Sequence, residues 1–292
     1  MIKRLAIAAL GVLLGAAPAR AAEGGRDIHR GIYGLTAGGD FYANLAAAKA
    51  GGFDLVVVNP YQEHLDAVAG AGMQAIVAFW LSPEDAATPE KWAAFQARIR
   101  SGVARFQGHR AVFAWYIADE PDGEGIPVDN IRQITSLARS LDPKTPLLAV
   151  FNSPRRWAEY FPYFDILCVD PYLRRRRILG GYETTEVVTR WLRAARQDLA
   201  RLGLKKPLWA VLGAFDSRPK AVGQAPGYKK PTPDEFRDMV GRARQEGVDG
   251  ILVYTFAFKE STRTYSWRLT QDDPKLWESV QRDLRGPRGR AP

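Results

Sequence analysis

Eight apolar segments rich in Val, Ile, Leu and aromatic residues recur along the chain. The apolar positions in each segment are continuous rather than alternating, which is typical of parallel strands that are buried on both faces. These segments predict strands at residues 31–36, 54–59, 73–80, 112–118, 147–151, 166–169, 208–212 and 251–256.

Segments with apolar residues at helical spacing lie between most of the predicted strands. They predict helices at residues 41–50, 61–71, 89–106, 128–141, 185–202 and 233–245, whereas the connection over 155–164 is shorter and less regular. Thr232 followed by Pro233, Asp234 and Glu235 is a typical helix start, because threonine caps well and proline suits the first turn.

Eight strands that alternate with helices over about 250 residues predict a single (β/α)8 TIM barrel of the α/β class. A doubly wound open sheet is the structural alternative, but no Gly-rich dinucleotide fingerprint follows the first strand. No linker rich in Pro or Ser divides the chain. We therefore expect one barrel domain over residues 22–284 and a disordered tail over 285–292.

The first 21 residues have the pattern of a signal peptide. Lys3 and Arg4 begin it, residues 5–17 are apolar, and Ala-Arg-Ala at 19–21 fits a cleavage site. We therefore expect export to the periplasm or secretion. The apolar run is too short to span a bilayer comfortably and no other run is long enough, so no stable membrane insertion is expected.

Composition narrows the choice of partners. With 46% hydrophobic residues the chain can bury a sizeable core, which excludes global disorder. The formal charge is +9, and removal of Lys3, Arg4 and Arg20 with the signal leaves +6. Surplus positive charge favours an acidic partner, and because we expect export, we expect no nucleic acid partner. Cys168 is the only cysteine, which excludes an intramolecular disulfide and favours a small buried side chain.

Two adjacent carboxylates end the fourth predicted strand. Pro121 has no N–H and stops the strand, so Asp119 and Glu120 are expected where it opens into a loop. Strand carboxyl ends are where barrel enzymes perform chemistry, and glycosidases need a carboxyl group held protonated as general acid. Glu120 is the candidate acid, because its side chain has reach and follows an apolar strand. The structural alternative is that the two residues cap a helix or pair with arginines.

A glycosidase needs a second carboxylate, and Asp170 after the sixth strand is the best-placed candidate. Asp216 and Glu260 are rivals, and Asp-Pro at 170–171 is also a common turn. The other strand ends carry aromatic and amide side chains, which suit sugars because rings stack on sugar C–H faces. The expected substrate contacts are Asp119, Asn59, Tyr61, Trp80, Asn152, Tyr172, Arg174, Asp216 and Lys259.

A run of four arginines at 174–177 lies on the same predicted rim, with further basic residues after strands seven and eight. Such a run is usually a solvated face. Arginine also binds carboxylate or sulfate by donating two parallel N–H···O hydrogen bonds, so an anionic glycan is a candidate substrate.

Cofactor and metal chemistry find little support in the sequence. The three histidines, His29, His64 and His109, form no HExxH or other close ligand pair, and Gly-x-Ser-x-Gly and phosphate-loop motifs are absent. Asp119, Glu120 and Asp122 do not have the spacing of a known calcium loop. We expect neither a cofactor nor a metal.

The blocks Trp-Tyr-Ile-Ala-Asp-Glu-Pro at 115–121 and Asp-Pro-Tyr at 170–172 resemble the (β/α)8 glycoside hydrolase superfamily, especially glycoside-hydrolase-like bacterial proteins. The same holds for the run from Thr232 into strand eight. The resemblance implies that Glu120 matches the acid/base glutamate of the largest retaining clan, where Asp119 replaces the usual Asn.

The clan's nucleophile is a glutamate after strand seven, whereas this chain has Leu-Gly-Ala-Phe-Asp at 212–216. Asp216 or Asp170 are the alternatives for that role. The resemblance therefore implies a glycoside hydrolase or, alternatively, a carbohydrate-binding barrel that has lost its nucleophile. A scaffold role in a cell-envelope complex is the third possibility.

Overall fold

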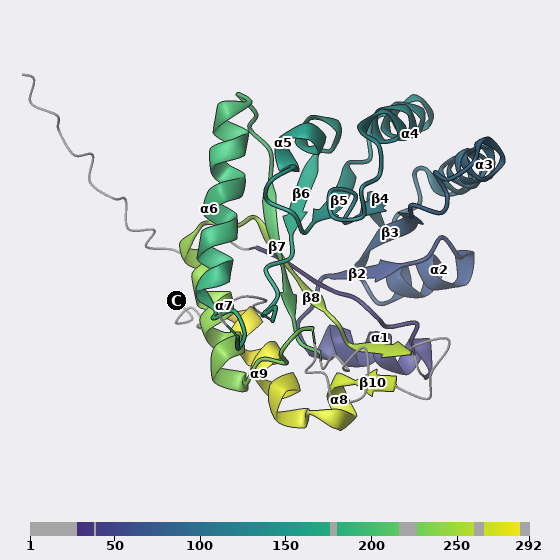
Figure 1. Ribbon diagram of the computed structural model, residues 1–292. Helices are drawn as coiled ribbons and strands as arrows, with labels where there is room; N and C mark the ends of the chain where they lie inside the picture. Colours follow the sequence, from purple (N-terminus) through teal and green to yellow (C-terminus); the bar gives the residue numbers. More distant parts are fainter. Residues whose placement is uncertain (1–27, 38, 176–179, 216–226, 260–265, 287–292) are drawn as a thin grey trace, which may run out of the picture.

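The computed structural model describes residues 28–37, 39–175, 180–215, 227–259 and 266–286. Eight strands pair in parallel in sequence order, and β8 pairs with β1 to close a barrel (Figure 1). The strands are β1 (His29–Ile32), β2 (Leu55–Val58), β3 (Gln74–Leu81), β4 (Val112–Asp119), β5 (Leu147–Phe151), β6 (Ile166–Val169), β7 (Leu208–Gly213) and β8 (Gly250–Tyr254).

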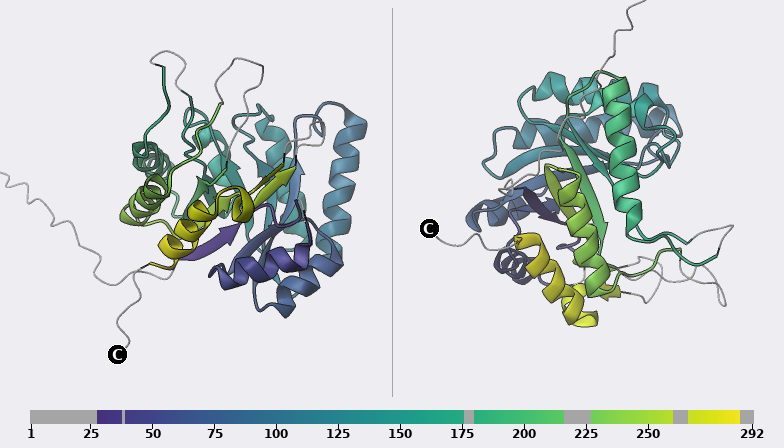
Figure 2. Two further views of the ribbon diagram at one scale, coloured as in Figure 1. Left: turned by 90° about the horizontal axis from the view of Figure 1, so that it is seen from below. Right: turned by 90° about the vertical axis from the view of Figure 1, so that its left-hand side faces the viewer.

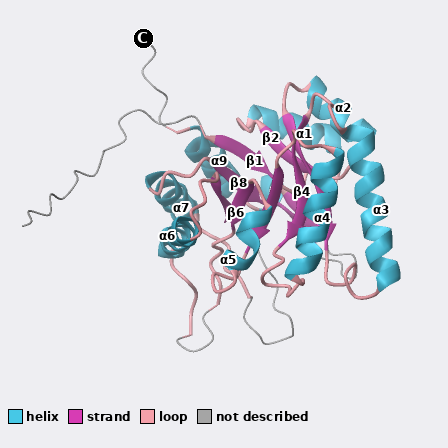
Figure 3. Ribbon diagram, turned by 90° about the horizontal axis from the view of Figure 1, so that it is seen from above, coloured by secondary structure: helices cyan, strands magenta, loops and turns pink. Residues whose placement is uncertain are grey.

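Helices cover the outside of the barrel, as the further views show (Figures 2 and 3). They are α1 (Phe41–Ala50), α2 (Gln62–Gly70), α3 (Pro89–Phe106), α4 (Val128–Leu141), α5 (Trp157–Tyr160) with the 3-10 turn η1 (Phe161–Tyr163), α6 (Glu186–Arg201), α7 (Pro233–Gln245), α8 (Leu269–Asp272) and α9 (Pro274–Arg285). The predicted single TIM barrel is confirmed. The described part of the chain contains no helix with the length and apolarity needed to cross a bilayer.

The first and last strands differ from their predicted bounds. The first strand was predicted at 31–36, but it ends at Ile32 because Gly34 turns the chain with a φ of 86°. A Cβ at Gly34 would lie 2.1 Å from the Ala257 carbonyl oxygen, so only glycine fits there. The strand predicted to reach residue 256 ends at Tyr254, and the chain then enters the antiparallel pair β9 (Ala257–Lys259) and β10 (Ser266–Arg268).

The sequence prediction missed α9, which occupies the eighth helical position and packs against α7. Its last residue is Arg285, the first residue of the predicted tail. The Arg285 side chain donates hydrogen bonds to the carbonyls of Ala50 and Gly51 at the end of α1. The helix that follows the last strand is therefore joined to the helix that follows the first. The predicted signal segment and the rest of the tail lie outside the described residues.

The core has two layers, one between the strands and helices and one inside the barrel. Inside, Trp209 on β7 stacks on His29 with ring centroids 5.2 Å apart and fills the amino-terminal end. Gly250 permits this, because a Cβ there would lie 2.4 Å from the indole. Cys168 belongs to the same interior layer and is fully buried, which confirms the expectation of a small buried side chain.

Candidate active site

Two residues at the carboxyl ends of neighbouring strands adopt left-handed backbone conformations. Trp80 in β3 has a φ of 54°, and Glu120, directly after β4, has a φ of 46°. Within the described ranges, no other residue except glycine has a positive φ. Residues with a Cβ rarely adopt this conformation, and those that do cluster at functional sites. These backbone conformations therefore point to a candidate site beside β3 and β4, at the end of the barrel where the strands have their carboxyl ends. We call this end the mouth of the barrel.

Glu120 is held by the end of the next strand. Its backbone N–H donates to the Val150 carbonyl over 2.9 Å, and Asn152 Nδ2 donates to Glu120 Oε2. Asn152 was predicted as a substrate contact, but in the structure its amide binds the candidate acid. Gly123 makes room for it, since a Cβ there would lie 1.9 Å from Asn152 Oδ1. Asn152 therefore fixes the position of the Glu120 carboxyl.

Asp122 anchors this loop, a role that the sequence did not reveal. Its side chain is 2% exposed and accepts hydrogen bonds from the backbone N–H groups of Asn152 at 3.3 Å and Ser153 at 2.5 Å. Burial raises the pKa of Asp122 to about 6, and the two N–H donors act in the opposite direction. The loops after β4 and β5 are thus joined around Glu120.

Asp119 lies at the end of β4 and binds a buried phenol. The Tyr116 hydroxyl, inside the barrel, donates to Asp119 Oδ1. Burial raises the pKa of Asp119 to about 7, which the Tyr116 hydrogen bond opposes and the charge of Glu120 reinforces. Tyr116 was not identified from the sequence, although a buried tyrosine hydroxyl normally needs a polar partner.

Asp170 follows β6 and is completely buried. Neither of its carboxyl oxygens accepts a hydrogen bond from any N–H or O–H group of the described residues. Burial raises the pKa of Asp170 well above its usual value, and the next largest contributions are the negative charge of Glu120 and a hydrogen bond between the two carboxyl groups. The structure thus brings Glu120 and Asp170 together, as the sequence predicted. Their catalytic roles stay predictions.

Among the described residues, aromatic rings follow β7. The strand ends at Gly213, and the Phe215 ring lies 5.4 Å from the ring of Tyr172 and 5.3 Å from that of Tyr254. Tyr228 closes this cluster, with its ring 5.6 Å from Tyr172. Between β7 and residue 215 the chain therefore offers no acid. The predicted rivals Asp216 and Glu260 lie outside the described residues.

The opposite side of the mouth carries an exposed indole. The Trp80 ring is 37% exposed and lies 4.9 Å from the Tyr116 ring. Its Nε1 donates to Asn59 Oδ1 over 2.9 Å, so the Asn59 side chain binds Trp80. Tyr61, next to α2, is 55% exposed. These three predicted contacts are therefore brought together on one side of the site.

Arg174 provides positive charge on the β6 side. Its guanidinium carbon lies 5.6 Å from the Tyr228 ring and 5.9 Å from the Trp191 ring, so two aromatic faces hold it. Its charge acts on Asp170 and lowers the pKa of that carboxyl, in opposition to burial. Arg175 is exposed beside it. Residues 176 and 177 of the predicted arginine run lie outside the described residues, and Lys259 is in β9.

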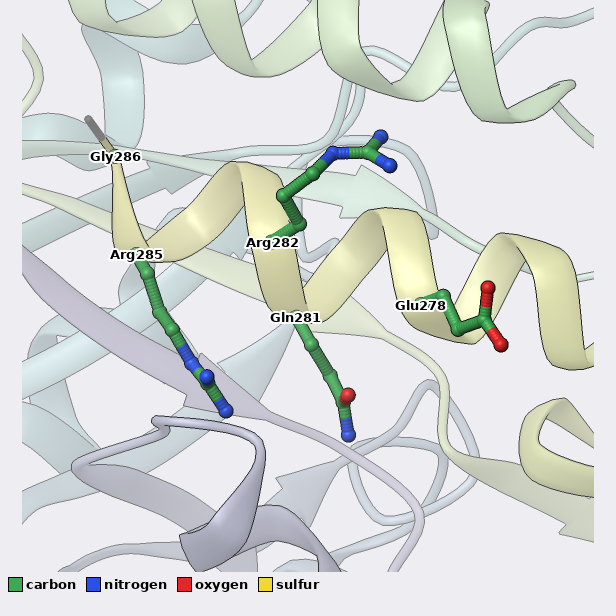
Figure 4. Close-up of a pocket in the computed structure, with 5 residues that line it drawn as sticks. All are labelled: Glu278, Gln281, Arg282, Arg285 and Gly286. Atoms are coloured by element: carbon green, nitrogen blue, oxygen red, sulfur yellow. The ribbon is translucent and has the colours of Figure 1, made fainter. Parts of the chain in front are cut away.

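Two surface hollows lie away from this mouth. One, of about 420 Å³, is formed by Glu278, Gln281, Arg282, Arg285 and Gly286 along α9 (Figure 4). The other, of about 580 Å³, lies beside the end of α6 and the start of β7. Both are where helices end and strands begin, the face of such barrels that contributes stability rather than chemistry. In the described ranges, no group of three or more His, Cys, Asp or Glu side chains is placed to hold a metal ion.

Comparison with known proteins supports the assignment of the fold. Beta-glucuronidases of Rattus norvegicus and Felis catus are each 24% identical over 161 residues, which is 53% of this chain and 24% of the relative. The chain thus spans about a quarter of the length of the curated relatives that it matches.

Among solved structures, a beta-galacturonidase from Eisenbergiella tayi bound to galacturonate superposes with a TM-score of 0.66 at 16% identity. The match covers 90% of this chain and 52% of that one. A beta-D-glucuronidase from Dictyoglomus thermophilum gives 0.62 at 17% identity, with 89% and 50% covered. At these identities the structures show a shared fold.

The family model described as "Glycosyl hydrolases family 2, TIM barrel domain" matches residues 64–269, from α2 to the start of α8. This range includes β3 to β8, and with them Trp80, Glu120 and Asp170. The resemblance to the (β/α)8 glycoside hydrolases is thereby confirmed, and the chain belongs to the TIM barrel domain of glycosyl hydrolases family 2.

Proposed function

We propose that this protein is a glycosidase that hydrolyses a glycosidic bond in a uronic-acid-containing oligosaccharide, with Glu120 as general acid. One observation carries the proposal. Glu120 stands at the left-handed end of β4, where Asn152 holds its carboxyl beside that of Asp170. A positioned carboxyl group at this end of a barrel is what protonation of a leaving oxygen requires.

Asp170 supplies the second carboxyl group of the centre. It lies beneath the mouth after β6, and its raised pKa reflects both burial and Glu120. Asp216 is the alternative second carboxylate that the sequence offers after β7.

A uronic acid as the sugar recognised is supported by Arg174. Its guanidinium lies near the rings of Tyr228 and Trp191, and these contacts restrict its orientation. A guanidinium held in this way can bind a carboxylate through two of its N–H groups. The names of the relatives point the same way: beta-glucuronidases among the curated proteins, and a beta-galacturonidase bound to galacturonate among the structures.

An oligosaccharide is supported by the exposed aromatic residues. Four large hydrophobic side chains of the described residues are exposed, and Tyr42, Tyr61 and Trp80 lie on the face where β1 to β3 end. The rings of Phe41 and His64 connect Tyr42 to Tyr61, with the Phe41 and His64 centroids 4.2 Å apart. Exposed rings of this kind stack on sugars beyond the one that is cleaved. The fourth, Leu202, follows α6.

We further propose that the protein acts in the periplasm or is secreted. The pattern of residues 1–21 supports this, and the excess of Lys and Arg suits an acidic glycan outside the cytoplasm.

The proposal is tested with a panel of glucuronides, galacturonides and their neutral counterparts. We expect wild type to cleave uronides, and Glu120→Gln to lose turnover by about 10²–10⁴-fold while still binding the sugar. Glu124→Gln is the matched control, because it removes the same charge from an exposed position of the same loop. Full turnover by Glu120→Gln on a good substrate would show that the acid assignment is wrong.

A second function is favoured by the end of β7. The residues from Gly213 to Phe215 contain no carboxylate, and the Asp170 oxygens are covered. A carbohydrate-binding barrel without hydrolysis would show these features. Tight uronide binding by the wild type, together with no turnover across the panel, would establish this alternative.

A further inference from the structure

We propose that Asp170 remains a neutral carboxylic acid whose O–H donates to Glu120 and stabilises the carboxylate that Glu120 becomes when it protonates a leaving group. This inference rests on the proposed role of Glu120 as general acid. It makes Asp170 a positioning residue that acts through Glu120, rather than a nucleophile or base that contacts the sugar.

The surroundings of Asp170 suit a neutral acid. The residue is 0% exposed, and no N–H or O–H of the described residues donates to either oxygen. A buried carboxylate without donors is strongly unfavourable, whereas a protonated acid needs one acceptor for its O–H. Glu120 is the side chain that raises the pKa of Asp170 most after burial, through its charge and a side-chain hydrogen bond, so we assign the acceptor to its carboxyl group. Two facing carboxyl groups can form this bond only if one of them holds a proton.

The charged and titratable groups around Asp170 do not cancel the effect of burial on its pKa. The charge of Arg174 lowers the pKa of Asp170. However, its guanidinium lies over two aromatic rings and makes no hydrogen bond to Asp170. Burial raises the pKa of Asp170, Glu120 raises it further and Asp119 adds to this. The groups that interact electrostatically with Asp170 are Glu120 and Asp119 at the end of β4, Cys168 in β6, Tyr172 and Arg174 after β6, Tyr33 after β1, and Tyr228 before α7.

The proton balance of hydrolysis is then simple. Glu120 gives its proton to the glycosidic oxygen as the bond from that oxygen to the anomeric carbon breaks. Water later supplies hydroxide to that carbon and returns a proton to Glu120. Asp170 keeps its own proton throughout and donates a hydrogen bond to the temporary Glu120 carboxylate. A hydrogen bond to a charged group is stronger than one to a neutral group, so it favours proton transfer to the leaving group.

Infrared spectroscopy tests the protonation directly and needs no substrate. At about pH 9, Asp119 and Asp122 have lost their protons, because their pKa values are about 7 and about 6. We expect a carbonyl band of a protonated carboxylic acid to remain in the wild type and to be absent from Asp170→Asn. Absence of the band from the wild type, or its persistence in Asp170→Asn, would overturn the proposal.

The same measurement tests the coupling between the two residues. In Glu120→Gln, the negative neighbour is gone, so we expect the Asp170 band to disappear at a lower pH than in the wild type. Glu124→Gln should leave the titration unchanged. An identical titration in Glu120→Gln and the wild type would show that Asp170 is buried but does not interact with Glu120, which contradicts the proposal.

Kinetics separates a positioning role from a substrate-contacting one. Asp170→Asn keeps an N–H donor, so we expect kcat within about tenfold of wild type, whereas Asp170→Leu should lose about 10²–10³-fold with little change in KM. Loss of turnover by Asp170→Asn as complete as in Glu120→Gln would make Asp170 a substrate-contacting carboxylate. The infrared results stand even if no glycoside is cleaved, so failure of the proposed function and failure of this inference are distinguishable.

Discussion

The Trp80 indole donates a 2.9 Å hydrogen bond to the Asn59 side chain, so the residue after β2 orients the exposed ring in β3. Trp80 also has a left-handed backbone, and its ring packs against Tyr116 with the centroids 4.9 Å apart. The exposed aromatic side of the mouth therefore depends on a residue that is not aromatic.

This relationship predicts the effect of Asn59→Ala on sugar binding. Loss of a neutral hydrogen bond worth about 0.5–1.5 kcal/mol should weaken oligosaccharide binding about two- to tenfold, and Trp80→Ala should weaken it more. Calorimetry in the Glu120→Gln background measures binding without turnover. Leu202→Ala is the control, since it removes an exposed apolar side chain far from the mouth. Unchanged affinity in both Asn59→Ala and Trp80→Ala would contradict the prediction.

A single methyl group at position 123 should displace the carboxyl group of Glu120. In Gly123→Ala the new Cβ would lie 1.9 Å from Asn152 Oδ1, so the amide that holds Glu120 must move. We expect kcat/KM to fall about 10- to 100-fold, and Asn152→Ala to have a similar effect. Gly241→Ala in α7, where nothing lies within 4 Å, should leave activity unchanged. Full activity of Gly123→Ala would show that Asn152 does not position Glu120.

Asp119 should make stability depend on pH. Its folded pKa of about 7 lies above the ordinary 3.8, so the folded state binds the proton more tightly than the unfolded chain. The resulting stabilisation is complete below about pH 4 and is lost as the pH rises through about 7. At about 1.4 kcal/mol per pKa unit it amounts to at most about 4 kcal/mol.

Asp119→Asn keeps an acceptor for the Tyr116 hydroxyl but does not titrate. We expect its free energy of unfolding to fall less between about pH 4 and 7 and to exceed that of the wild type at about pH 8. Urea unfolding over this pH range provides the measurement. An equal pH slope in both proteins would assign the effect to another group.

Arg174 should discriminate uronic acids from neutral sugars. Arg174→Gln removes a charged hydrogen bond worth about 1.5–3 kcal/mol, so binding of a uronide should weaken about 10- to 100-fold while its neutral counterpart is unaffected. Arg174→Lys should be intermediate, because lysine lacks the planar fork. Arg175→Gln is the matched control at the next, exposed position. Equal losses for the two sugars would exclude carboxylate recognition by Arg174.

Much of the fold follows from sequence because parallel strands and amphipathic helices leave clear patterns. The capping box at Thr232 and Glu235 is present where the sequence predicted a helix start. The missed helix α9 has strong helical periodicity, and its start signal is Asp273 before Pro274, which resembles the signal that identified α7. It lies beyond the last predicted strand, and β9, β10 and α8 separate it from β8.

The site was only partly predictable, for a geometric reason. The strand ends led to Glu120, Asp170 and Trp80, and closure of the barrel brings those ends together. No pattern along the chain could show that Asn59 and Asn152 bind the side chains of Trp80 and Glu120. These partners lie 21 and 32 residues away in sequence, and only the register between strands determines the contacts.

The left-handed backbone at Trp80 and Glu120 has a consequence for how this sequence can change. An L-residue with a Cβ pays about 1–2 kcal/mol for that conformation, and glycine adopts it freely. Substitution by glycine at either position would therefore relieve the backbone while deleting the indole or the carboxyl. Backbone stability and the proposed role in the site therefore favour opposite residues at these two positions. Trp80 and Glu120 are therefore two positions where this chain has a strained backbone at its candidate site.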